Sequence, residues 1–185
     1  MMNLALLVLG VVALILIWVV VIYNHLIRQK AMLHESESGI FVQQKRRYDL
    51  IPNLVNVVSG YSMHEKELLQ SIVSLRSMAM QSRGSLEAGV VENNLSGALK
   101  TLFAVSENYP DLKANQNFLE LQRNLTLIEN ELQLSRRYYN GVARNYNMAI
   151  KTFPSVIIAS LFHYESAAYF ALDDQAEALP PTIKF

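Results

Sequence analysis

The feature that most constrains this chain is a long apolar seam near its middle. Apolar side chains return every third or fourth residue, which is the period of a helix packed against other helices. The seam consists of Ala114, Phe118, Leu121, Leu125, Ile128, Leu132, Ser135, Tyr139, Val142, Tyr146 and Ala149. At a rise of about 1.5 Å per residue, this helix would extend about 55 Å, too far for one buried helix in a small globule. The seam therefore predicts the central helix of a bundle.

The N-terminus carries an uncharged apolar run from Leu4 to Tyr23. About 20 helical residues cross the roughly 30 Å hydrocarbon layer of a bilayer, so we predict a transmembrane anchor over residues 1–23. A cleavable signal would need a basic start, a shorter apolar core and a small-residue cleavage site, which this run does not offer. Trp18 and Tyr23 are expected at the membrane interface. The basic residues follow the run, so we expect the N-terminus outside the cell and the rest of the chain in the cytoplasm.

A second pattern of spacing 3 and 4 begins at Ile40 and ends at Ala79, after a polar stretch that we predict to be a juxtamembrane helical stalk over residues 24–44. The pattern keeps its register across Pro52, so we expect one long helix that is kinked there and does not reverse. That helix should end at residue 82, with Gly84 as its C-terminal cap and Ser85 as the next N-cap.

Two further helices are expected on either side of the seam helix. One covers residues 86–108 and stops at Pro110. The other covers residues 155–171, and because it is apolar on most sides we expect it to be largely buried. The fold prediction is all-α, with a transmembrane helix continuing into a long kinked helix and an antiparallel four-helix bundle over residues 45–172. Residues 173–185 are expected to form an extended tail.

The sequence shows little that resembles catalytic chemistry. It has 16 basic and 16 acidic residues and no cysteine, and a neutral balance argues against nucleic-acid binding. His64 and Glu65 open like a zinc-protease helix, but position 68, where the second histidine would stand, is leucine. We therefore predict no metal, no cofactor and no enzymatic activity. A metal-dependent hydrolase using His64 and Glu65 stays a remote alternative.

Several polar residues lie on or beside the apolar stripes and are candidate structural or interaction sites. Glu65 would need a salt bridge or hydrogen bond inside the bundle. The other candidates recur at a spacing of seven, so that equivalent groups share one helix face, and polar groups along a seam commonly fix helix register. They are Glu129, Arg136, Tyr139, Asn140, Tyr146 and Asn147. A strip for partner binding is the second interpretation, and we interpret the basic cluster at residues 45–47 as a solvated face.

Longer motifs carry a family resemblance. They include Lys45-Arg46-Arg47-Tyr48-Asp49-Leu50-Ile51-Pro52-Asn53-Leu54-Val55, Tyr109-Pro110-Asp111-Leu112-Lys113-Ala114-Asn115 and Phe153-Pro154-Ser155. The chain resembles the LemA family of bacterial membrane proteins from residue 23 to its end. The resemblance implies an anchored helical bundle inside the cell and an accessory part in envelope or membrane-protein maintenance. The chain departs from the family where His163 replaces a common glycine.

The predicted function is that of a non-enzymatic scaffold or adaptor in the cell's inner membrane. Two long apolar stripes are expected to be incompletely covered, which favours self-association into a homo-oligomer or docking of a membrane partner such as an envelope protease. The lipid bilayer is the other expected partner. A transmembrane signal transducer is the alternative function.

Overall fold

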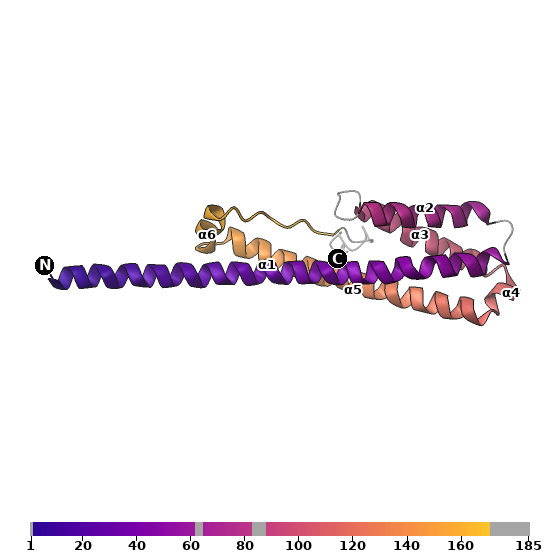
Figure 1. Ribbon diagram of the computed structural model, residues 1–185, viewed down its shortest axis with the longest axis horizontal. Helices are drawn as coiled ribbons and strands as arrows, with labels where there is room; N and C mark the ends of the chain where they lie inside the picture. Colours follow the sequence, from indigo (N-terminus) through magenta and orange to yellow (C-terminus); the bar gives the residue numbers. More distant parts are fainter. Residues whose placement is uncertain (1, 62–64, 83–87, 171–185) are drawn as a thin grey trace, which may run out of the picture. The chain divides into compact units, whose positions relative to one another are not determined.

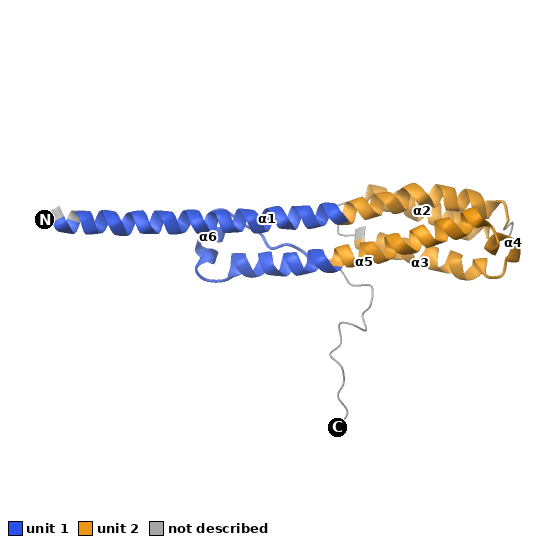
Figure 2. Ribbon diagram, turned by 90° about the horizontal axis from the view of Figure 1, so that it is seen from below, with its two compact units in different colours: residues 1–39, 137–169 blue, residues 40–136, 170–185 orange. Residues whose placement is uncertain are grey.

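The computed structural model describes residues 2–61, 65–82 and 88–170 (Figure 1). These residues form six helices and no strand, which confirms the all-α prediction. The helices are α1 (Met2–Ser59), α2 (Lys66–Gln81), α3 (Ala88–Ser106), α4 (Pro110–Lys113), α5 (Gln116–Lys151) and α6 (Ser155–Leu161). The fold divides into two compact units, and the long helices α1 and α5 contribute to both (Figure 2).

Unit 1 comprises residues 1–39 and 137–169. Its part of α1 begins with the apolar run, whose most apolar stretch is not buried by any other part of the chain that the structure describes. This helix is long and apolar enough to cross a membrane. Further along α1, Leu26 is fully buried against the end of α5 and against α6. The predicted stalk therefore packs against other helices within this unit.

Unit 2 comprises residues 40–136 and 170–185 and contains a bundle of four helices. Its helices differ from the predicted set, because α2 is a separate helix of this bundle and the last helix, α6, belongs to unit 1. The rest of α1, α2, α3 and the first part of α5 lie side by side around one apolar core (Figure 2). The fully buried centre of this core comprises Ile51, Leu54, Val58, Ile72, Leu95, Leu99, Leu102, Leu112, Phe118 and Leu125. The spacing of these side chains along each helix explains why the chain forms helices here.

The central seam forms α5, and its members from Phe118 to Ala149 are buried or half-buried. The helix begins two residues later than the seam predicted, because the short helix α4 and a turn precede it. Asn115 caps the start of α5, since its Oδ1 atom accepts a hydrogen bond from the backbone N–H of Phe118 at 3.0 Å.

The prediction of one helix from residue 40 to residue 82 is wrong. The helix α1 ends at Ser59, and α2 begins at Lys66. Gly60, a poor helix former, follows the end of α1, and the N–H of Tyr61 bonds to the carbonyl of Val58 at 2.9 Å, which tightens the last turn. The apolar pattern crosses the break because both helices face the same core.

Pro52 lies inside α1 and does not end the helix. A proline has no N–H, so the carbonyl of Tyr48, four residues earlier, loses its helical donor. The side chain of Arg76 on α2 supplies a replacement, since its Nε atom donates to that carbonyl at 2.7 Å. The chain therefore continues as a helix through Pro52.

The last helix, α6, is shorter and more exposed than predicted. It ends at Leu161, and only Ile158 and Ala159 are buried. The chain then leaves the helix through His163, whose φ of 53° lies in the left-handed region. The N–H of Tyr164 bonds to the carbonyl of Ala159, and the N–H of His163 bonds to that of Ser160, which is the Schellman pattern.

The left-handed backbone of His163 is a conformation that glycine adopts most readily. Beyond this turn, residues 164–170 are extended and belong to no helix. The predicted caps Gly84 and Ser85 and the predicted tail over residues 173–185 lie outside the described residues.

Candidate functional site

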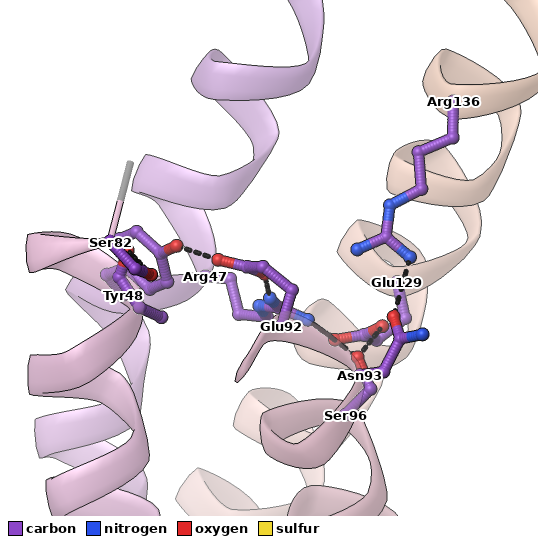
Figure 3. Close-up of polar contacts among 9 residues, drawn as sticks. Arg47, Tyr48, Ser82, Glu92, Asn93, Ser96, Glu129 and Arg136 are labelled. Carbon is purple, nitrogen blue, oxygen red and sulfur yellow. Dashed lines mark hydrogen bonds and ion pairs between the residues drawn. The ribbon is translucent and has the colours of Figure 1, made fainter. Parts of the chain in front are cut away.

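A cluster of charged side chains lies inside the bundle of unit 2 (Figure 3). We call it the core ion cluster and define it as Arg47 and Tyr48 on α1, Glu92 and Ser96 on α3, and Glu129 on α5. The cluster thus joins three of the four helices of the bundle.

Arg47 is the centre of the core ion cluster. Its guanidinium forms ion pairs with Glu92 and with Glu129. Its Nη1 atom also donates to the hydroxyl of Ser96 at 2.8 Å, and that hydroxyl donates to Glu129 at 3.0 Å. The phenol of Tyr48 donates to the second oxygen of Glu92. Each carboxylate therefore has both an ionic and a neutral donor.

Burial makes these contacts obligatory. Arg47 has no exposed surface and Glu92 is 2% exposed. A buried charge without a partner costs several kcal/mol, so each of these groups depends on the others. On α5, Arg136 is also buried and donates to Asn93, the neighbour of Glu92, at 3.4 Å. The ion pairs join the helices from inside the bundle, which favours a structural role for the cluster.

Sequence reasoning identified Glu129 and Arg136 but missed the two residues at the centre. Arg47 was interpreted as part of a solvated face, and this is wrong, because only its neighbours Lys45 and Arg46 are exposed. A signal was present, since Arg47 stands on the apolar stripe between Gln44 and Ile51. The sequence indicated the burial of Glu92 less clearly, through its position three residues before Leu95, which is apolar and buried.

Glu65 lies at the N-terminal end of α2 and is half-buried. The phenol of Tyr109 donates to it at 3.4 Å, and burial together with the Glu65 charge raises the pKa of Tyr109 above 10.0. His64 lies outside the described residues. Among the residues that are described, no group of three or more histidines or carboxylates is arranged to hold a metal ion.

The two tyrosine-asparagine pairs, Tyr139-Asn140 and Tyr146-Asn147, lie on α5 in unit 1. Both tyrosines donate to main-chain carbonyls of the extended segment: Tyr139 to Ala168 at 3.1 Å and Tyr146 to Glu165 at 2.9 Å. Asn147 binds Ala167 twice, donating to its carbonyl at 2.9 Å and accepting from its N–H at 2.8 Å. We call residues 164–170 the strap.

The pairs therefore bind the strap to α5. Asn140 lies half-buried beside Tyr139. The candidate residues of α5 thus divide between the two units, with Glu129 and Arg136 in the bundle of unit 2 and the two pairs in unit 1.

The outer surface of unit 2 has an open groove between α1 and α5 with a volume of about 470 Å³. Four asparagines are among its lining residues: Asn53 and Asn56 on α1, and Asn117 and Asn124 on α5. Elsewhere on α5, Leu119, Leu127 and Leu134 are exposed. Because these leucines are eight and seven residues apart, they lie on one face of the helix.

The family model of the LemA family matches residues 36–185. This chain belongs to the LemA family. Protein LemA of Metamycoplasma hominis is 28% identical over 151 residues, which cover 80% of this chain and 68% of that protein. Magnetosome proteins MamQ 1 and MamQ 2 of Paramagnetospirillum magneticum are each 21% identical over 174 residues, which cover 80% of this chain and 64% of each relative. The chain thus spans about two thirds of the length of these relatives.

LemA family membership and the exposed apolar start of α1 together indicate a membrane-anchored protein. The family resemblance inferred from the sequence motifs is confirmed.

Proposed function

We propose that this LemA family protein is a scaffold that acts by binding other proteins, among them a second copy of itself. In this proposal the bundle lies in the cytoplasm, and α1 anchors it in the inner membrane of a bacterium. The basic residues that follow the apolar run support this orientation. In this proposal the scaffold takes part in the maintenance of envelope or membrane proteins.

The observation that carries the proposal is the contrast between the inside and the outside of unit 2. Inside, the charged groups of the core ion cluster are paired with one another, and Arg47 and Glu92 are buried. Outside, Leu127 and Leu134 on α5 are 57% and 56% exposed. Large apolar side chains that repeat along one exposed face are typical of a surface that a partner covers.

A second copy is the occupant that we propose for this face. Two chains anchored in one bilayer meet at a high effective concentration, so a modest apolar contact suffices to hold them together. In a twofold dimer, equivalent leucines of the two copies contact each other, and no complementary surface on another protein is needed. The groove between α1 and α5, which four asparagines line, offers amide donors and acceptors to a further partner segment, such as one of an envelope protease.

Molar mass tests the self-association. We expect the full-length protein in mild detergent to have an oligomeric mass, and the double variant L127E/L134E to shift toward a monomer. Val90 on α3 is 64% exposed, so V90E is the matched control and should keep the oligomeric mass. A monomeric mass for the unmodified protein would contradict the proposal.

Crosslinking in the membrane provides a second readout. The chain has no cysteine, so single-cysteine variants report one position each. We expect L127C and L134C to crosslink between copies, and T101C, on the exposed side of α3, to stay uncrosslinked. Equal crosslinking at all three positions would show random collision and would count against a specific interface.

A further inference from the structure

We propose that the corner between α5 and α6 is a second membrane contact, which inserts into the lipid interface beside the transmembrane part of α1. Four large apolar side chains of this corner are exposed: Phe153, Ile157, Leu161 and Phe162. The occupant that we propose for them is the boundary between the headgroups and the acyl chains of the same bilayer that holds α1.

The first argument is position along α1. The ring of Phe162 contacts the ring of Tyr23, with 4.8 Å between centroids. Val19 and Ile22 of α1 pack against the buried residues of the same apolar cluster, which includes Ile158. The corner therefore lies beside the last turn of the apolar run, and Figure 1 shows α6 next to this part of α1.

This position along α1 places the corner at the depth of the membrane interface. At a rise of about 1.5 Å per residue, Val19 lies about 6 Å deeper in the bilayer than Tyr23, which ends the uncharged run. Helices that lie in the membrane plane bury their apolar face about 5–10 Å into the headgroup and acyl boundary. The contacts of α6 with residues 19–23 place it in this layer.

The second argument is the distribution of charge. From residue 152 to residue 164 the chain has no lysine, arginine, aspartate or glutamate, and Lys151 and Glu165 flank this stretch. On α1 the first charged residues after the apolar run are Arg28 and Lys30. Lys30 lies 5.6 Å from the ring centroid of Tyr164. The uncharged parts of both segments therefore lie beside each other, and charge begins in both just beyond them.

Exposure is the third argument. Phe153 is 80% exposed and Leu161 is 68% exposed, although both are large and apolar. Neither fills the core of unit 1, where Ile158 and Ala159 pack. Continuity with the transmembrane run identifies lipid as the cover for these side chains. Two attachment points then restrict how unit 1 tilts and rotates at the membrane, which a single helix crossing cannot do.

The test uses the full-length protein in vesicles of phosphatidylcholine and phosphatidylglycerol. Single-cysteine variants F153C and L161C carry an environment-sensitive fluorophore, and both sites are exposed, so the label disturbs no core contact. The matched control is V90C, 64% exposed on α3 in unit 2 and outside the proposed contact between copies. I15C, in the middle of the apolar run, reports full lipid exposure.

Two quenchers separate the outcomes. We expect lipids spin-labelled near the headgroup to quench positions 153 and 161 several times more strongly than position 90, while aqueous iodide quenches position 90 most strongly. If positions 153 and 161 behave like position 90, the corner lies in water and the proposal is wrong. Protection from iodide without quenching by lipid would mean that protein covers the corner, and this outcome also overturns the proposal.

Discussion

Arg76 on α2 donates its Nε–H to the main-chain carbonyl of Tyr48 at 2.7 Å, and Pro52 is the reason that this carbonyl is available. The contact joins two helices of the bundle at the point where one of them lacks an internal hydrogen bond. A helix that includes proline in its interior is normally weakened there by about 3 kcal/mol. In this protein a neighbouring side chain offsets part of that cost.

Replacement of Arg76 by methionine should destabilise the protein by about 1–2 kcal/mol, because the carbonyl of Tyr48 then loses its charged donor. In a P52A background, residue 52 regains an N–H that can bond to this carbonyl, so the same replacement should cost much less. Denaturant unfolding of the four proteins of this double-mutant cycle gives the coupling free energy between residues 52 and 76. R123M, at an exposed arginine of α5, is the control. An equal cost of R76M in both backgrounds would refute the interpretation.

Arg47 holds two carboxylates inside the bundle. R47M should cost about 3–5 kcal/mol in unfolding free energy, because Glu92 and Glu129 are left without their counter-charge. Arg46 is the exposed neighbour, and R46M should change the stability by less than about 0.5 kcal/mol. The further replacement of both glutamates by glutamine should recover part of the loss. A cost for R47M no larger than that for R46M would exclude a structural part for the cluster.

Asn147 should hold the strap through its two hydrogen bonds with Ala167 and a third, at 3.3 Å, to the hydroxyl of Tyr169. N147L should release residues 164–170, with a loss of about 1–3 kcal/mol in local stability. Hydrogen exchange of full-length protein should show faster exchange in the strap and unchanged exchange in α3. Met148 is the exposed neighbour, so M148L is the control. Unchanged exchange in the strap of N147L would show that other contacts hold it.

His163 has a left-handed backbone, which disfavours residues that carry a Cβ atom. H163G should stabilise the protein by up to about 1 kcal/mol, since glycine adopts this conformation without steric cost. H163A keeps the Cβ atom and should bring no gain. Thermal unfolding in detergent compares the three proteins. A gain in H163A as large as that in H163G would assign the effect to the imidazole and not to the backbone.

High pH should detach the strap. Burial is the main cause that raises the pKa of Tyr139 and of Tyr146 above 10.0. Glu37 adds to the effect at Tyr139, and Tyr164 and Glu165 add to it at Tyr146. The folded state thus favours the neutral phenol, so the stabilisation is complete below the unfolded-state pKa of about 10 and is lost as the pH rises through the folded-state value.

Hydrogen exchange or proteolysis of the strap as a function of pH checks this expectation. The double variant Y139F/Y146F has no phenol to ionise at these sites, so the alkaline step in strap release should be absent. Y138F removes an exposed phenol of the same helix and should keep the step. A step that persists in Y139F/Y146F would assign it to other groups.

The fold class, the apolar anchor and the seam of α5 could be predicted from the sequence, because helical periodicity is a local property. Leu125 and Leu132 repeat at the helical period whatever they contact, and both are buried. Family membership was equally readable, since long motifs are contiguous in the chain. The break after Ser59 was not, because two successive helices that face one core keep one pattern of spacing.

Tertiary structure alone decided the partners of the polar groups. Arg47 and Glu92 are 45 residues apart, and no local pattern indicates that they meet. The carbonyls that Tyr139 and Tyr146 bind belong to an extended segment whose side chains have no helical period. A hydrogen bond or ion pair depends on two atoms coming within about 3 Å of each other, and only the packing of the helices brings these atoms together. The sequence by itself therefore determined the fold class, the long helix α5 and which segment is apolar enough for a membrane. The packing decided where the helices break, which charged groups are buried and which groups they pair with.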